Sequence, residues 1–185
     1  DNFEENLKII NNQIKQIGNL VNEFSDFARM PKPILKKNDL LKIIRDNIKL
    51  LSEIDTSIKL NLITDKPLIL FESDKEQMNR VIFNLIKNSI ESIQQKAKNT
   101  SDFDKNINVE IYEKSNQIYI IIIDNGSGFG SFSNNLNEIL NPYVTTKKNG
   151  TGLGLSIVNK IINDHNGKLT FFSIPNGAKV EIIFN

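Results

Sequence analysis

Cysteine is absent from this chain of 185 residues, and histidine occurs only once, as His165. Without cysteine the chain can form no disulfide, no thiolate metal site and no cysteine nucleophile. The formal net charge of +1 indicates neither a nucleic-acid surface nor an acidic tail. The longest apolar run, residues 118–123, is far too short to span a bilayer. The polar and acidic first residues do not form a signal peptide.

What is present is the composition of a soluble globular protein, with 39% hydrophobic and 24% charged residues. The length suits one sizeable domain, or one domain with a helical appendage. Because the chain begins inside a helical pattern and without an initiator methionine, we expect it to be a piece of a longer protein.

Residues 1–30 carry a heptad seam, in which apolar residues recur at alternating steps of four and three. The seam consists of Phe3, Leu7, Ile10, Ile14, Ile17, Val21, Phe24 and Ala28. Leu20 and Phe27 widen it to a stripe that suits a four-helix bundle. We therefore expect this helix to pair with an upstream helix, a second copy of the chain, or both. The alternative is a helix that packs on its own domain.

Prolines in a linker over residues 31–38 end this helix, and residues 39–185 follow as a mixed α/β pattern. Apolar periodicity predicts helices over 40–51, with Asp39 as N-cap, and over 74–96 and 153–164. It predicts strands over 57–63, 68–71, 107–111, 118–123, 169–174 and 178–184. Residues 126–150 read as a long lid or binding loop. The fold class is thus α+β, with one mixed sheet, helices on one face, and a long N-terminal helix before it.

Asp124 ends the most apolar strand and stands directly before Asn-Gly-Ser-Gly. A carboxylate there can accept a hydrogen bond from an exocyclic amine such as that of adenine, and such a bond contributes about 1.5–3 kcal/mol. Gly126 and Gly128 would let the backbone approach a flat ring closely. The alternative is an Asx turn that closes the strand.

The sequence Gly-Thr-Gly-Leu-Gly at 150–154 leads into a helix, and such a loop directs several N–H groups at one place, which suits phosphate. It is neither a P-loop nor the dinucleotide fingerprint. Thr145, Thr146, Lys147 and Lys148 lie just upstream and can add hydroxyl and ammonium contacts. The alternative is a glycine-rich turn beside two solvated lysines.

Asn84 and Asn88 are four residues apart, so they share one helix face, and Glu91 continues that face. Neutral oxygen ligands suit Mg²⁺, which binds through few protein ligands together with water and phosphates. The alternative is a pair of solvated helix asparagines. For His165, which lies where a helix ends, we expect a structural role as a cation at the helix C-terminus, with Gly167 as the left-handed cap.

These motifs, in this order, closely resemble the catalytic, ATP-binding domain of bacterial sensor histidine kinases over about residues 39–185. The motifs are the N box at 79–92, the G1 box at 124–128, the F box at 142–147 and the G2 box at 150–155. Residues 24–33 further resemble the end of the dimerisation helix pair in nitrogen-sensor kinases of the NtrY/NtrB type.

The resemblance implies a GHKL-type (Bergerat) α/β sandwich, named for gyrase, Hsp90, histidine kinases and MutL. In such a domain Asp124 would bind the adenine amine, and Asn88 would coordinate Mg²⁺ with Asn84 beside it. The other implied nucleotide contacts are Gly126, Gly128, Lys147, Gly152, Leu153 and Gly154. Residues 129–150 would form the mobile ATP lid. Two departures from the family pattern are Pro142-Tyr143-Val144 in the F box and Gly177-Ala178 near the adenine.

A further departure is that the phosphoacceptor histidine of the family belongs to the first helix of the dimerisation pair, whereas residues 1–30 match only the second. The γ-phosphate of ATP would pass to that missing histidine and then to an aspartate of a response-regulator receiver domain. We therefore predict that this chain binds Mg-ATP but cannot phosphorylate itself. The resemblance also implies a homodimer through residues 1–30 with the missing first helix, and the cytoplasmic part of a membrane-anchored kinase.

Three other classes stay open at this point. A hydrolytic GHKL ATPase needs a general base, which by resemblance is a glutamate where this chain has Asn84, and an amide cannot take a proton. A dimerisation scaffold without kinase activity would use the heptad seam but leaves the glycine clusters unexplained. A serine kinase of the anti-sigma type has the same fold, but the helix over residues 1–30 argues against it.

Overall fold

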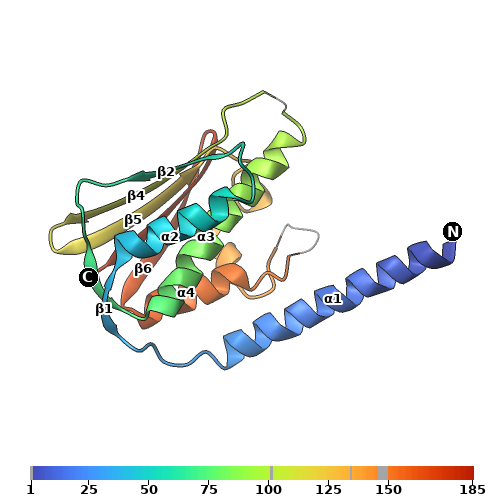
Figure 1. Ribbon diagram of the computed structural model, residues 1–185, viewed down its shortest axis with the longest axis horizontal. Helices are drawn as coiled ribbons and strands as arrows, with labels where there is room; N and C mark the ends of the chain where they lie inside the picture. The colour runs from blue at the N-terminus through green and yellow to red at the C-terminus, as the bar shows by residue number, and fades with distance from the viewer. Residues whose placement is uncertain (1, 101, 134, 146–149) are drawn as a thin grey trace.

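A five-stranded sheet is the base of the domain in the computed structural model, which describes residues 2–100, 102–133, 135–145 and 150–185 (Figure 1). In spatial order its strands are β2 (Lys59–Ile63), β4 (Asn106–Lys114), β5 (Gln117–Asp124), β7 (Gly177–Phe184) and β6 (Gly167–Ile174). Strands β2 and β4 are parallel and all other neighbours are antiparallel. The predicted α+β fold with one mixed main sheet is therefore confirmed.

Three helices cover one face of this sheet (Figure 1). They are α2 (Leu40–Ser52), α3 (Lys75–Ala97) and α4 (Gly154–Asp164). Both α2 and α3 begin at an aspartate N-cap, since Asp39 accepts from the N–H of Leu41 at 3.0 Å and Asp74 from that of Gln77 at 3.1 Å. The helices predicted from apolar periodicity thus form where expected, with their starts set by side-chain caps.

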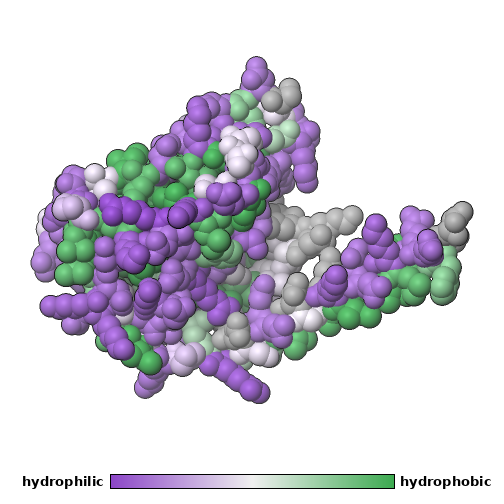
Figure 2. Space-filling model, in the orientation of Figure 1, coloured by the Kyte–Doolittle hydropathy of each residue, from purple (hydrophilic) through white to green (hydrophobic). Residues whose placement is uncertain are grey.

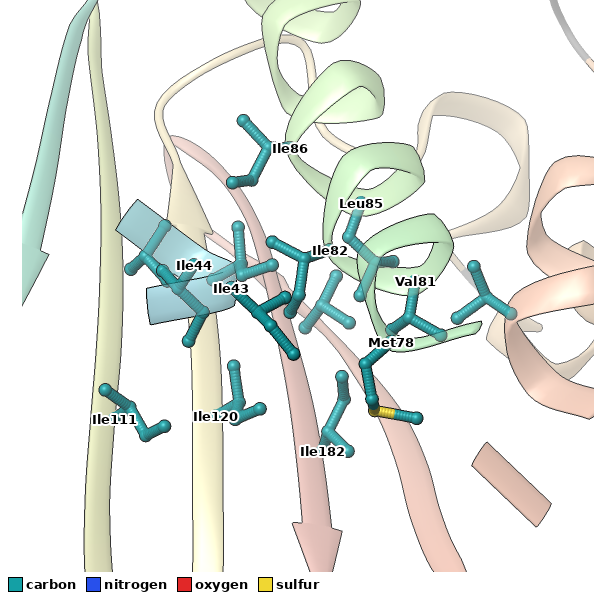
Figure 3. Close-up of a cluster of buried hydrophobic side chains, with 14 of the residues drawn as sticks. Ile43, Ile44, Met78, Val81, Ile82, Leu85, Ile86, Ile111, Ile120 and Ile182 are labelled. Carbon is teal, nitrogen blue, oxygen red and sulfur yellow. The ribbon is translucent and has the colours of Figure 1, made fainter. Parts of the chain in front are cut away.

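Aliphatic side chains from the helices and the sheet interlock in the core (Figure 3). Figure 3 labels Ile43 and Ile44 of α2, Met78, Val81, Ile82, Leu85 and Ile86 of α3, and Ile111, Ile120 and Ile182 of the sheet. Each is almost completely buried. Full burial of such a side chain contributes about 1.5–3 kcal/mol relative to leaving it exposed. This layer fixes α3 on the sheet, and α3 in turn carries the polar residues of the candidate site.

A second, two-stranded sheet is a feature that the sequence did not predict. Strand β1 (Lys36–Asp39) pairs antiparallel with β3 (Leu70–Ser73), so the end of the segment expected to be a linker is extended and hydrogen-bonded. The side chain of Asn38 adds a bond to the carbonyl of Ser73 at 2.7 Å. Since the sequence Lys-Lys-Asn-Asp has no apolar alternation, periodicity could not reveal this strand.

Helix α1 (Asn2–Ala28) extends away from the domain, and a hydrophobic stripe runs along it in the space-filling view (Figures 1 and 2). The exposed apolar residues of this stripe are Phe3, Leu7, Ile9, Ile10, Ile14, Ile17, Leu20, Val21 and Phe24. The domain therefore does not cover the seam, which contradicts the alternative of a helix packed on its own domain. No helix in the described part of the chain is both long and apolar enough to cross a membrane.

His165 has a structural role, but not as the predicted cation. It caps α4 with only 5% exposure, and its Nδ1 lies 2.8 Å from the carbonyl of Ile161. Its Nε2 accepts a hydrogen bond at 3.0 Å from the backbone N–H of Asp74. An accepting Nε2 leaves Nδ1 as the donor, so the ring is neutral in this arrangement. The left-handed residue at this helix end is Asn166, with φ 55°, and not Gly167.

Gly167 is required for space, because a Cβ there would lie 2.7 Å from the Phe184 ring and 2.9 Å from Cγ2 of Ile162. We expect Gly167→Ala to lower the free energy of unfolding by about 1–3 kcal/mol through overpacking. Urea denaturation followed by circular dichroism measures this. Gly18→Ala in α1 is the matched control, since nothing lies within 4 Å of its Cβ position. A Gly167→Ala variant as stable as that control would contradict the assignment.

Candidate nucleotide site

Asp124 lies at the end of β5 and is only 4% exposed. Its Oδ1 accepts a hydrogen bond from the N–H of Gly126 at 2.9 Å and lies 3.4 Å from the hydroxyl of Ser92. Burial raises the pKa of Asp124, while hydrogen bonds from Gly126, Ser89 and Ser92 act in the opposite direction. The Gly126 bond is the Asx turn considered as an alternative. That turn is made by Oδ1, so it is compatible with ligand binding by the same carboxylate.

The turn after Asp124 is packed tightly against the rest of the domain. A Cβ on Gly126 would lie 2.6 Å from the carbonyl carbon of Ser92, and one on Gly177 would lie 1.8 Å from the carbonyl oxygen of Asp124. Gly128, with φ +69°, lies next to the carbonyl of Gly177. The glycine at 126 therefore permits contact with the backbone of α3, a role that the sequence alone did not reveal.

One face of α3 connects the carboxylate to the second glycine cluster. Ser92 contacts Asp124, while a Cβ on Gly154 would lie 3.8 Å from Oδ1 of Asn84. Asn88 lies between them, because residues four apart share a helix face. The eight residues from Asn84 to Ser92 span about 12 Å at 1.5 Å per residue. The structure thus brings four residues predicted for the site, Asp124, Asn88, Asn84 and Gly154, to one side of one helix.

Ser89 and Ser92 are members of this site that the sequence reasoning missed. Ser89 is buried, and both serines supply hydrogen bonds to Asp124. Helical spacing was the available signal, since Ser92 follows Asn88 by four residues on the predicted helix. Polar side chains facing a buried carboxylate keep it hydrogen-bonded in the absence of ligand.

The glycine cluster that precedes α4 is folded onto the F box. The carbonyl of Gly152, which has φ +70°, accepts from the N–H of Tyr143 at 3.1 Å, and a Cβ on Gly152 would lie 2.5 Å from the carbonyl carbon of Tyr143. Leu153 is fully buried, so its side chain anchors the loop to the domain. The predicted contact Lys147, together with Thr146 and Lys148, lies outside the described residues.

The predicted lid is not wholly irregular, since it contains the short 3-10 helices η1 (Gly130–Phe132) and η2 (Leu136–Leu140). Phe129 meets Phe171 of β6 edge-on at 5.7 Å, and Ile139 is buried in the core. These apolar contacts hold Phe129 and η2 of the lid segment against the domain.

The described surface has two open hollows, of about 350 and 430 Å³. The first lies between α4 and residues 140–142, and the second lies between residues 126–130 and 173–177 beside Lys96. Of the predicted nucleotide residues, Gly126 and Gly128 border the second hollow. Among the described residues no group of three or more His, Cys, Asp or Glu side chains could hold a metal ion.

Comparison with known proteins agrees with this geometry. Residues 73–185 match the family described as histidine kinase-, DNA gyrase B-, and HSP90-like ATPase, and the chain belongs to this family. The nitrogen regulation protein NtrY of Azorhizobium caulinodans is 34% identical over 185 residues, which are 95% of this chain and 22% of NtrY. The chain therefore spans about a fifth of the length of that relative. The sequence-based assignment to the catalytic domain of sensor histidine kinases of the NtrY type is confirmed.

Solved structures show the same fold. The catalytic domain of the histidine kinase ThkA superposes with a TM-score of 0.68 at 25% identity, over 81% of this chain and 94% of that one. ThkA in complex with the response regulator protein TrrA superposes with a TM-score of 0.75 at 22% identity, over 95% of this chain and 49% of that one.

The burial of Asp124 predicts a pH dependence. Because its pKa in the folded chain is raised above the ordinary 3.8, the folded state holds the proton more tightly than the unfolded state does. The free energy of unfolding should fall as pH rises from 3.8 to the raised pKa. We expect Asp124→Asn, which carries no charge, to remove this fall and to be more stable than the wild type at neutral pH without ligand.

Thermal unfolding across this pH range checks the prediction, with Asp65→Asn at an exposed position as the control. The advantage of Asp124→Asn should shrink as the pH falls. A variant that is less stable than the wild type at neutral pH would show that the buried charge stabilises the unliganded fold.

Proposed function

We propose that this chain binds Mg-ATP and presents the γ-phosphate to a histidine in another segment of a longer sensor kinase. The observation that carries the proposal is the row on α3, which runs from the buried carboxylate of Asp124 past Asn88 and Asn84 to Gly154. An amine acceptor at one end and a glycine loop at the other suit the base and the phosphates of one nucleotide.

In this proposal the chain consists of three parts. Residues 1–30 are the second helix of a dimerisation region, 31–38 are a linker whose end forms β1, and 39–185 are the ATP-binding domain. The exposed stripe of α1 supports association with a second copy and the missing first helix. The complex of ThkA with the response regulator TrrA supports a receiver domain as the partner that accepts the phosphoryl group.

The residues divide the work of binding and positioning. Asp124 would accept the adenine amine, and the backbone at Gly126, Gly128, Gly152, Leu153 and Gly154 would line the nucleotide, with Lys147 near the phosphates. Asn88 would hold Mg²⁺ with Asn84 beside it. When bound, the ion would neutralise charge on the phosphate oxygens. The catalytic contribution of this domain is then positioning and charge stabilisation.

The amide at position 84 favours phosphotransfer over ATP hydrolysis. A hydrolytic enzyme must activate water with a general base, and the Asn84 amide cannot accept a proton. Asn84 is half-buried on α3 next to the second glycine cluster, where a base would have to act. The alternative of a hydrolytic ATPase is therefore disfavoured by the chemistry of this side chain.

Calorimetric titration with a non-hydrolysable ATP analogue tests the nucleotide site. We expect saturable binding that Mg²⁺ strengthens, and Asp124→Asn should weaken it by about 1.5–3 kcal/mol through loss of a hydrogen bond to a charged group. Asp65→Asn is the matched control and should bind like the wild type. Absence of binding at millimolar nucleotide, or equal affinity for Asp124→Asn, would contradict the proposal.

We also expect no autophosphorylation of this chain. His165 is buried, and both of its ring nitrogens are hydrogen-bonded to the backbone, so neither can attack a phosphoryl group. Incubation with labelled ATP should give no acid-labile label, whereas a longer chain that includes the upstream helix and its histidine should be labelled. Labelling of the 185-residue chain itself would show that this prediction is wrong.

A further inference from the structure

In the described part of the chain, α1 and the segment that follows it are hydrogen-bonded to the domain. At its exit, the side chain of Gln77 donates to the carbonyl of Pro31 at 3.1 Å, and Asp74 accepts from the N–H of Ile34 at 2.9 Å. Farther back along the helix, a carboxylate oxygen of Glu23 accepts a hydrogen bond from the hydroxyl of Thr151. Figure 1 shows the C-terminal part of α1 next to the segment that leads into α4. The second attachment therefore joins α1 to the second glycine cluster itself.

The hydroxyl of Thr151 contacts both α1 and the backbone of the glycine loop before α4, where we propose that a phosphate binds. It donates to Glu23 and lies 3.4 Å from the N–H of Leu153, at the start of α4. The N-terminus of a helix favours a negative group, whether this is a carboxylate or a phosphate. Glu23 therefore places a negative charge beside the same loop that is proposed to receive the phosphates, and like charges at this range repel.

We infer that Glu23 is a positioning residue that holds the glycine loop through Thr151 and competes with the phosphates of an incoming nucleotide. Docking of α1 through this contact and binding of a triphosphate then weaken each other, because coupling between two binding events is reciprocal. The inference rests on the proposed function, since it assigns the phosphates to the loop at Gly150–Gly154.

Calorimetry of the 185-residue chain with two ligands tests the competition. The ligands are a non-hydrolysable ATP analogue and adenosine, which lacks phosphate. Glu23→Gln removes the charge and keeps an acceptor, Glu23→Ala removes both, and Glu5→Gln is the control about 27 Å away along the same helix. We expect both Glu23 variants to bind the triphosphate at least about fivefold more tightly, the lower end of typical couplings. Their affinity for adenosine, and both affinities of Glu5→Gln, should equal those of the wild type.

The outcomes separate this inference from the proposed function. If the wild type binds neither ligand, the proposed nucleotide site itself is wrong, and the inference falls with it. If the wild type binds both ligands and Glu23→Gln matches it, only the competition is wrong. An equal gain for adenosine and for the triphosphate would also overturn it, because the carboxylate would then not oppose phosphate charge.

Spin-label distances give a second readout that does not depend on affinity. The chain has no cysteine, so Asn12→Cys on α1 and Asn99→Cys after α3, both at exposed positions, would carry the only two labels. We expect the ATP analogue to shift or broaden the distance distribution, and Glu23→Ala to show that distribution before any ligand is added. Identical distributions in all three states would show that α1 is not held through Glu23.

Discussion

The turn after β5 is closely packed against backbone on both sides, and this steric constraint positions the rest of the candidate site. On one side the backbone of Gly126 lies against the backbone of α3 at Ser92, and on the other side Gly177 lies against the carbonyl of Asp124. Any side chain at either glycine would separate these segments. The carboxylate of Asp124 is consequently confined beside α3, where the serines Ser89 and Ser92 supply hydrogen bonds to it.

Confinement of the Asp124 carboxylate opposes stability at the position where we propose that it binds a ligand. Burial raises the pKa of Asp124, which means that its charged form is disfavoured in the unliganded fold. Hydrogen bonds from Ser89 and Ser92 and the large aliphatic core offset this penalty. A hydrogen bond to a buried charged group is electrostatically stronger than the same bond in water. Helix α3 thus carries the core on one face and the candidate site on another.

Local sequence patterns revealed most of the fold, and long-range contacts account for what they missed. The period of Val81, Ile82 and Leu85 predicted α3, and Asp39 marked the start of α2 correctly, because these signals act within one turn of a helix. Strand β1 was missed because it is polar and is stabilised only by pairing with β3.

The candidate site likewise combines residues that local sequence patterns indicate with contacts between distant positions that they do not. Asp124, Asn84 and the glycine clusters were proposed as site residues from their own neighbours in the sequence. The neutral ring of His165 depends instead on the N–H of Asp74, 91 positions away, and the contact between Glu23 and Thr151 joins positions 128 apart. No pattern in one sequence reports such a distance, because each partner lies in a different segment of the chain.

The two faces of α1 explain why its contact with the domain is polar. Its apolar stripe is exposed, which keeps that surface available for other helices, and the contact of the helix with its own domain is made by Glu23 outside the stripe. A single hydrogen bond to a charged group contributes about 1.5–3 kcal/mol, far less than the core contributes to the domain. The contact is therefore weak enough to be broken by a ligand and specific enough to depend on one carboxylate. A helix docked through an apolar face would stay docked whatever the charge nearby. A helix docked through Glu23 can be released by negative charge in the candidate nucleotide site.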